Sequence, residues 1–302
     1  MTRRSFAAVV AAFVLLSACS DTPSPSGSAA GSGSAQPTPT ATPSGTTLPG
    51  ESASVAPTPS ATPTYPPSGC RAGNRVPAGE QQTLTTVPDA GHAVALTLDM
   101  GGRLDPGIDI LNFLIANGVC ATIFPTGALA QTPEGQQVMA VIGAHPELFE
   151  IGNHPMHHCN LVVGGGGSPT LAPCAGVNPT ADFIRSELTD AAAILEQFSG
   201  QHAVPYWRPP YGVTNQAVRD TAASLGYTKT IMWDVDTIDW KPIADGGPTA
   251  EQIATKVVSN AADGSIVLMH LGGYETLAAL TMMVPALRDR GFLLTSISDL
   301  LD

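Results

Sequence analysis

The chain is poor in positive charge. Its 302 residues include 13 Lys and Arg against 25 Asp and Glu, which gives a formal net charge of −12 at pH 7. No basic stripe is visible in the sequence, so the electrostatic footprint of nucleic acid binding is missing. No Gly-x-Gly-x-x-Gly or P-loop pattern follows any predicted strand, which weakens a nucleotide-binding alternative. Nucleic acid is therefore not expected as a partner.

The apolar run at the start of the chain is too short to span a bilayer as a finished helix. Arg3 and Arg4 precede it, and small residues follow it up to Cys19. This order predicts a secretory signal over residues 1–19 and an exported protein, whose net charge falls by two to −14 once both arginines are removed. "LLSAC" resembles a bacterial lipobox, which implies that Cys19 becomes a lipid anchor in the cell membrane, facing the cell wall. An ordinary cleaved signal with a chance cysteine is the alternative.

Residues 20–69 lack large apolar side chains and consist mostly of Ser, Thr, Pro, Gly and Ala. Such a segment cannot offset the entropy of ordering, so we expect a disordered tether. The remaining residues, 70–302, have the size of one α/β domain.

Cysteine is scarce as well, with five in the chain. Apart from Cys19, the even number in an exported protein suggests two disulfides with three possible connectivities. Cys159 and Cys174 flank a Gly-rich loop that a bridge would constrain, and pairing them leaves Cys70 with Cys120. The competing role for Cys159 is that of a metal thiolate beside the nearby histidines.

Strand and helix patterns alternate along the domain. This alternation predicts a parallel sheet with helices outside, and near-continuous apolar strands favour a barrel of about seven strands over an open doubly wound sheet. Strands are expected at 92–99, 120–126, 148–154, 204–212, 227–236, 265–271 and 292–298, and helices at 105–118, 133–144, 180–198, 214–226, 249–264 and 277–291. Asp105 is the expected cap of the first helix.

Five polar residues lie at or just beyond the carboxyl ends of predicted strands. In parallel α/β architectures these ends converge on one face, where ligands bind. Any one alone has a structural explanation, but together they predict one shared cleft. They are Asp99, His154, Arg208, Asp239 and His270.

The segment "EIGNHPMHHCNL" places three histidines within five positions. Two imidazoles converge on a metal ion when they are four residues apart on a helical turn, which selects His154 and His158. His157 takes part only if the turn is tighter, and surface histidines in a loop are the structural alternative.

The segments "TLDMGG", "NHPMHH", "RPPYG", "DTIDW" and "LMH", in this order, resemble the five motifs of the NodB-type polysaccharide deacetylases, carbohydrate esterase family four. The resemblance covers about residues 90 to 300. It implies a distorted (β/α)-barrel and a divalent metal, often zinc. The implied reaction removes acetyl groups from chitin-like glycans, peptidoglycan or xylan.

The resemblance also implies roles for single residues. Asp99 matches the catalytic base and Arg208 the residue that pairs with it, while His154 and His158 match the metal-binding histidines. Pro155 stands where the family usually has Ser or Thr.

The remaining motifs match the oxyanion, acid and substrate residues. Tyr211 matches the residue whose backbone N–H binds the oxyanion, and His270 matches the general acid. Asp239 matches the residue that tunes this acid, Trp240 a wall of the site, and Leu268 the pocket for the acetyl methyl group.

The sequence departs from the family at Met100, where a second Asp usually binds the metal. A thioether is a poor ligand for such a cation, so the affinity for zinc is in question. Water or Asp99 could complete the site, or Asp105 or Asp236 could substitute for the missing ligand. The third alternative is a glycan-binding relative without catalysis.

These observations predict a metal-dependent deacetylase that acts on the amide-linked acetyl groups of cell-envelope polysaccharide, with peptidoglycan as the first expectation. The rival is a noncatalytic glycan-binding lipoprotein on the same fold. A transporter's substrate-binding lipoprotein would have two lobes, whereas one alternating domain is predicted here.

Overall fold

The structure is a computed structural model, and it describes Cys70 and residues 76–302. The expected signal and lipidation site (1–19) and the expected tether (20–69) lie outside the described residues. Within the described range, no helix combines the length and apolar character needed to cross a membrane.

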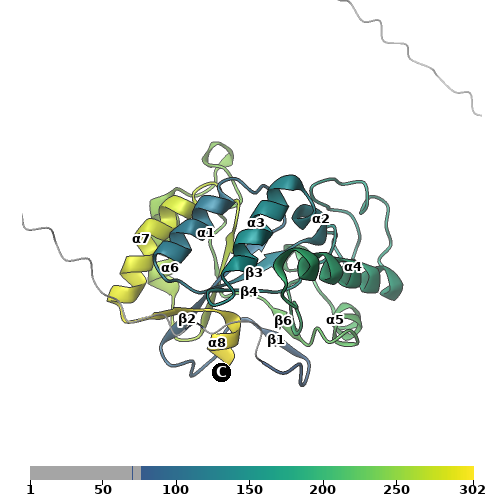
Figure 1. Ribbon diagram of the computed structural model, residues 1–302, viewed down its shortest axis with the longest axis horizontal. Coiled ribbons are helices and arrows are strands. Elements are labelled where there is room, and N and C mark those ends of the chain that lie inside the picture. The colour runs from purple at the N-terminus through teal and green to yellow at the C-terminus, as the bar shows by residue number, and fades with distance from the viewer. Residues whose placement is uncertain (1–69, 71–75) are drawn as a thin grey trace, which may run out of the picture. The chain divides into compact units, whose positions relative to one another are not determined.

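Strands and helices alternate along the described chain (Figure 1). The strands are β1 (Gln82–Leu84), β2 (Ala93–Met100), β3 (Ala121–Pro125), β4 (Phe149–Ile151), β5 (Tyr206–Trp207), β6 (Lys229–Ile231), β7 (Val235–Asp236), β8 (Ser265–His270) and β9 (Leu293–Thr295). The α-helices are α1 (Gly107–Ala116), α2 (Gly127–Ala130), α3 (Pro133–Ala144), α4 (Ala181–Ser199), α5 (Gln216–Ala223), α6 (Ala250–Asn260), α7 (Thr276–Asp289) and α8 (Ile297–Leu301).

The ladders between these strands are all parallel, as the alternation predicts. One sheet has the order β4-β3-β2-β8-β7, with β9 also paired to β2, and the other has the order β1-β6-β5. A parallel bridge between Asn153 and Trp207 joins the end of β4 to β5. The predicted α/β class with a parallel sheet is therefore confirmed. The cylinder is distorted, because the ladders form two sheets rather than one closed ring.

The central strand β2 separates two layers of the core. Val94, Leu96, Leu98 and Met100 belong to the large apolar cluster that contains the helix side chains. Ala93 and Ala95 belong to the smaller cluster with Phe124, Tyr206 and Ile231, which lines the interior between the sheets. Side chains alternate along a strand, so Thr97 and Asp99 continue the interior face toward the carboxyl end.

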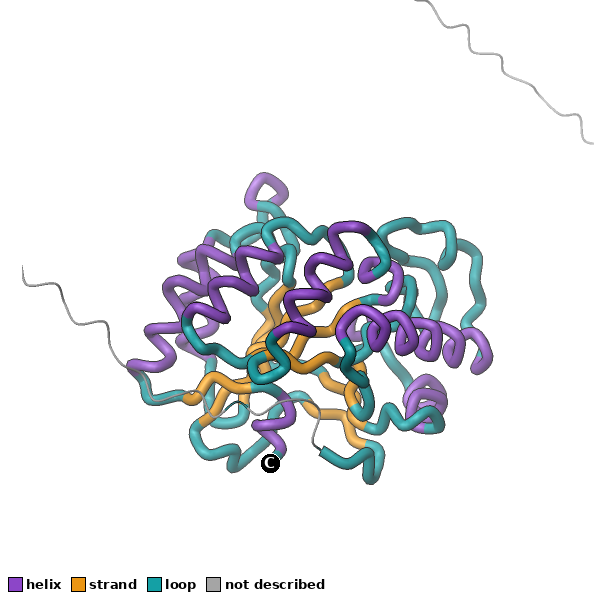
Figure 2. Tube along the Cα trace, viewed as in Figure 1, coloured by secondary structure: helices purple, strands orange, loops and turns teal. Residues whose placement is uncertain are grey.

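Helices cover the outside of the strands, which occupy the middle of the molecule (Figure 2). α1, α3 and α7 lie side by side over one part of the sheet, and α4 continues this layer beside α3 (Figure 1). This arrangement leaves the carboxyl ends of β2, β3 and β8 to carry loops and polar side chains.

The structure differs from the predicted elements in several places, including the short helix α2, which the predicted set lacks. The strand expected at 227–236 is split into β6 and β7, which belong to different sheets. The strand expected at 292–298 ends at Thr295, because the Ser296 hydroxyl caps α8. The prediction of Asp105 as a helix cap is wrong, since α1 begins after Pro106 and Asp105 binds Arg103 instead. The short β1 has no apolar pattern and was not predicted.

Both pairs of domain cysteines form disulfides in the structure. Cys70 bonds to Cys120 with a Cα–Cα distance of 5.7 Å, and Cys159 bonds to Cys174 at 5.3 Å. The alternative of Cys159 as a metal thiolate is therefore wrong, because its sulfur is already bonded.

Candidate active site

Asp99 lies at the carboxyl end of β2 and forms a buried ion pair with Arg208. The Arg208 Nη1 atom donates to the Asp99 Oδ1 atom at 2.7 Å, and both side chains are buried. Burial raises the pKa of the Asp99 carboxyl, but the charges of Arg208, His154 and His270 outweigh it and hold the pKa below its ordinary value. Asp99 is therefore an ionised carboxylate.

The Arg208 guanidinium is held from several sides. Its Nε donates to the carbonyl of Ile231 at 3.0 Å and its Nη2 to the Thr97 hydroxyl at 2.9 Å. The guanidinium also lies 4.2 Å from the centre of the Phe124 ring. Arg208 is thus held rigidly as the partner of Asp99.

His154 and His158 are the histidines whose rings face each other, with centroids 4.8 Å apart. The Nδ1–H of His154 donates to the Arg208 carbonyl at 2.8 Å, which leaves Nε2 as the free nitrogen, 3.5 Å from the Asp99 Oδ2 atom. His157 turns away and binds the buried Glu187 at 2.6 Å. The pair selected from the sequence therefore lies together, but not through the expected helical turn: the segment is irregular, with positive φ at Pro155 and His158.

Burial keeps both facing imidazoles neutral. It lowers the pKa of His154, and together with the charge of His154 it lowers the pKa of His158 to about 3. Neutral imidazole is the form that ligates metal ions. A carbonyl that fixes the second nitrogen, as the Arg208 carbonyl does for His154, is the usual support of a metal-bound histidine.

His270 ends β8 and is the register partner of Asp99 on β2. Its Nδ1–H donates to the Asp239 Oδ1 atom at 2.7 Å, and its backbone N–H donates to Asp239 Oδ2 at 2.8 Å. The Thr276 hydroxyl also binds Asp239 Oδ2. Burial lowers the pKa of His270, but Asp239 and Asp99 outweigh it and raise the pKa above its ordinary value.

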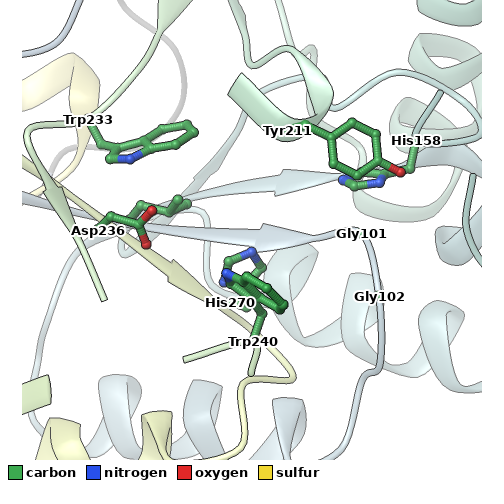
Figure 3. Close-up of a pocket in the computed structure, with 9 residues that line it drawn as sticks. Gly101, Gly102, His158, Tyr211, Trp233, Asp236, Trp240 and His270 are labelled. Carbon is green, nitrogen blue, oxygen red and sulfur yellow. The ribbon is translucent and has the colours of Figure 1, made fainter. Parts of the chain in front are cut away.

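Two of these groups, His158 and His270, line a cavity of about 450 Å³. Figure 3 shows Tyr211 and His158 at one end, Trp233 and Asp236 at another, and His270 with Trp240 on a third side. Leu268 also lines the cavity and is buried. The remaining lining residues are Gly101 and Gly102. The five residues expected to share one cleft are linked by contacts through Asp99 and His270, but only His270 lines this cavity. Asp99 lines a smaller adjoining cavity with His270, and His154, Arg208 and Asp239 line neither.

Tyr211 connects the cavity to the Gly-rich loop that the Cys159–Cys174 disulfide closes. Its ring lies edge-on to His158, with centroids 4.6 Å apart. Its hydroxyl accepts the backbone N–H of Gly167 at 3.2 Å. A Cβ on Gly166 would lie 2.4 Å from this hydroxyl, so the close approach requires glycine. The loop thereby supports Tyr211, which lines the cavity.

The donor set fits a divalent ion incompletely. His154 and His158 supply two nitrogen ligands, and Asp99 is a carboxylate beside His154. Met100 is fully buried in the large apolar cluster. Among the described side chains, these ligand atoms do not form a group of three within 4.8 Å of one another. We conclude that the two imidazoles fit a metal and that the usual third ligand is missing.

The two carboxylates considered as substitutes differ in position. Asp236 lines the cavity, and its Oδ1 accepts the backbone N–H of Ile238. The side chain of Asp105 is 89% exposed, binds Arg103 and lies outside the cavity lining. Asp105 is therefore removed as a candidate ligand.

Trp233 and Glu187 are site residues that the motifs did not identify. Trp233 follows β6 and lines the cavity. Glu187 lies on the apolar face of α4 between Ile184 and Leu188, and accepts hydrogen bonds from the turn that carries the histidines. An acid on an apolar helix face is a sequence signal that could have found Glu187.

Comparisons with known proteins agree with this arrangement. The sequence profile of the polysaccharide deacetylase family matches residues 86–230. A peptidoglycan-N-acetylglucosamine deacetylase of Bacillus cereus is 30% identical over 71% of this chain and 91% of its own length. A chitooligosaccharide deacetylase of Sinorhizobium fredii is 29% identical over 71% of this chain and 95% of its own length.

Among solved structures, similarity extends to a carbohydrate esterase family four pseudoenzyme of Bacillus anthracis, BA3943, in a mutant form with restored enzymatic activity. That mutant is 29% identical, with a TM-score of 0.61 over 74% of this chain and 72% of its own. The chain described here belongs to the polysaccharide deacetylase family and has its NodB fold, so its class is that of a carbohydrate-acting hydrolase.

Proposed function

We propose that the protein removes N-acetyl groups from peptidoglycan in a metal-dependent reaction. The observation that carries this proposal is the pairing of an ionised Asp99 with a readily protonated His270 on adjacent strands, where both line the same cavity of about 260 Å³. Deacetylation of an amide needs one group to accept the proton of the attacking water and another to protonate the leaving amine. The surroundings of Asp99 lower its pKa, which suits a base, and those of His270 raise its pKa, which suits an acid.

In this proposal each residue has a separate task. His154 and His158 would hold a divalent ion, which when bound would supply a Lewis acid for the acetyl carbonyl. Asp99 accepts the proton of the attacking water, and Arg208 keeps its carboxylate ionised and oriented. By its resemblance to the family motif, the Tyr211 backbone N–H is assigned as the donor to the developing oxyanion.

Collapse of the tetrahedral intermediate requires a proton for the departing nitrogen. His270 donates this proton from Nε2, because its Nδ1–H is held by Asp239. The C–N bond then breaks, and acetate and a free amine are formed. Leu268 supplies an apolar surface for the methyl group and Trp240 a wall for the sugar.

Two observations support the proposal that the substrate belongs to the cell envelope. The Bacillus cereus relative is a peptidoglycan-N-acetylglucosamine deacetylase, and another relative, PdaA of Bacillus subtilis, is a peptidoglycan-N-acetylmuramic acid deacetylase. The predicted lipobox at Cys19 and the Pro-rich residues 20–69 supply an anchor and a reach into the wall. We infer that the protein is exported, anchored to the membrane by lipid, and faces the cell's own envelope.

The decisive experiment measures acetate release from peptidoglycan, chitooligosaccharide and acetylxylan, with and without added zinc. We expect zinc-stimulated release that is greatest on peptidoglycan and falls at least a hundredfold in Asp99→Asn and His270→Ala variants. Wild-type rates in either variant would overturn the mechanism.

A noncatalytic glycan-binding protein is the second candidate, and Met100 favours it because the usual metal ligand is absent. The structural similarity to a pseudoenzyme is consistent with it. Metal analysis of the purified protein separates the two. Less than about a tenth of an equivalent after zinc loading, with no acetate released from any substrate, would leave glycan binding as the function.

A further inference from the structure

A second cavity of about 260 Å³, lined by both Asp99 and His270, adjoins the larger cavity. The two cavities share Gly102, Trp240 and His270 as lining residues. The second is also lined by Arg103, Gly272 and Tyr274, which the proposed reaction does not use. A glycan chain is longer than one sugar, so a neighbouring cavity that contacts the general acid can hold a further part of the substrate.

Arg103 is held in this second cavity with its charged end accessible. Its guanidinium lies 4.4 Å from the centre of the Tyr274 ring, and its Nη1 donates to the Gly272 carbonyl at 3.2 Å. Its Nη2 binds Asp105 at 2.8 Å. These two hydrogen bonds use only part of the five N–H donors of a guanidinium, and the side chain is 37% exposed. The Tyr274 ring and the Gly272 carbonyl thus orient the Arg103 guanidinium, and its remaining N–H donors can bind a ligand.

The charges along the two cavities are unequal. Arg103 is the only Lys or Arg among the residues that line either cavity. Asp236 lines the larger cavity, and Asp99, which lines the smaller one, is already paired with the buried Arg208. A substrate with an anionic substituent is therefore favoured with that substituent at Arg103, away from Asp236.

We propose that Arg103 binds a carboxylate on the glycan beside the acetyl group that is removed. A planar guanidinium binds carboxylates through two parallel hydrogen bonds, and Asp105 occupies part of that position when no substrate is bound. The chemical class is a glycan with a carboxylate-bearing ether or peptide substituent, such as the lactyl group of N-acetylmuramic acid. This inference rests on the proposed deacetylation and specifies its substrate.

The test compares two tetrasaccharides on the zinc-loaded full chain. One is chitotetraose, which has no carboxylate, and the other is a peptide-free peptidoglycan tetrasaccharide with lactyl groups. For Arg103→Gln we expect kcat/KM on the lactyl substrate to fall about tenfold, through KM, and to change less than twofold on chitotetraose. Arg103→Lys should recover part of the loss. Equal losses on both substrates would overturn the proposal, because Arg103 would then act only by holding Tyr274 and Gly272.

The control variant is Asp105→Asn, which leaves the fold's apolar packing intact because Asp105 is exposed. Removing the competing carboxylate should raise kcat/KM on the lactyl substrate at least twofold and leave chitotetraose unchanged. This measurement tests the proposal even if Arg103→Gln fails to fold, and an unchanged rate on the lactyl substrate would count against it.

Direct binding separates this inference from the proposed function. If the wild-type protein releases no acetate from either tetrasaccharide, the proposed function fails. Calorimetric titration should still show tighter binding of the lactyl tetrasaccharide than of chitotetraose, with the difference lost in Arg103→Gln. Equal affinities for both tetrasaccharides would overturn the role of Arg103 as well.

Discussion

At the scale of single residues, Asp239 is the neighbour that contributes most to keeping His270 protonated. The buried Asp239 accepts both the ring Nδ1–H and the backbone N–H of His270. The resulting pKa of His270 lies above its ordinary value, so the proton needed by the leaving amine is retained at higher pH. The same pair stabilises the fold below the unfolded-state pKa, and this stability is lost as the pH rises through the folded-state pKa.

We predict that Asp239→Asn lowers the pKa of His270 while leaving an oxygen to accept its Nδ1–H. The high-pH limb of the kcat/KM profile should move to lower pH, and the rate at pH 8 should fall more than the rate at pH 6. A pH series of acetate release on chitooligosaccharide measures this. A profile that drops uniformly without moving its limb would show that Asp239 does not tune the acid.

Met100 is the second position where one side chain matters, because it replaces the usual metal ligand. It is fully buried in the apolar cluster beside the helices, next to Gly101, whose Cβ position lies 2.8 Å from the His158 ring. A side chain at position 101 would therefore collide with His158, while the side chain before it packs in the core.

We predict that Met100→Asp destabilises the metal-free protein by about 3 kcal/mol, because an unpaired carboxylate enters an apolar cluster. Saturating zinc should recover much of that loss, since a ligand that binds only the folded state stabilises it. Thermal unfolding with and without zinc measures both effects. Met100→Leu is the matched control and should cost less than about 1.5 kcal/mol with no change in the response to zinc. A zinc-dependent shift no larger than that of the wild type would mean that position 100 cannot reach the metal.

At the scale of secondary-structure elements, α4 holds the turn that carries the histidines. Its buried Glu187 accepts the backbone N–H groups of Met156 and His157 at 3.1 and 2.9 Å, and the His157 ring at 2.6 Å. One carboxylate thereby fixes the segment between the two facing imidazoles.

We predict that Glu187→Gln costs about 1–3 kcal/mol of stability, because the new amide opposes one of these donors. The relaxed turn should also weaken zinc binding, measured by competition with a chromophoric chelator. Asp190→Asn is the control on the same helix, since Asp190 is exposed, and it should change stability by less than about 0.5 kcal/mol. Unaltered zinc affinity in the Glu187 variant would show that the turn is fixed by other contacts, such as the disulfide-closed loop.

At the scale of the whole molecule, the net charge of −12 opposes an anionic polymer as substrate. If peptidoglycan with free carboxylates is the substrate, it is repelled at long range, whereas the proposed contact with Arg103 acts only at short range. Screening therefore affects the approach of the polymer more than binding in the cavity.

We predict that raising the salt concentration from about 10 mM to about 150 mM increases kcat/KM on intact peptidoglycan severalfold, because the screening length falls from about 30 Å to about 8 Å. Chitotetraose is uncharged and serves as the control, with little expected change. A decrease with salt on peptidoglycan would indicate that local attraction dominates the encounter.

Local sequence pattern predicted most of the fold. The apolar strands near 92–99, 120–126 and 265–271 are recovered as β2, β3 and β8, since hydrophobic burial on both faces is visible in composition alone. The segment 227–236 was predicted as one strand, but it divides between two sheets. The last strand was predicted to end at residue 298, but it ends at Thr295. The Ser296 side chain accepts the backbone N–H of Asp299 and starts α8, which stops the strand.

For the candidate site, spacing and motif order selected His154 and His158 and grouped Asp99, Arg208, Asp239 and His270. These residues are recognisable in the sequence because parallel strands bring their carboxyl ends to one face. Only the tertiary structure decided that Met100 packs in the apolar cluster and that Asp105 stays outside the cavity. It also decided that Glu187 binds the segment with the histidines and that Arg103 lines the smaller cavity. Periodicity records which face of an element is buried, whereas the partner that a side chain meets depends on segments far away in the sequence.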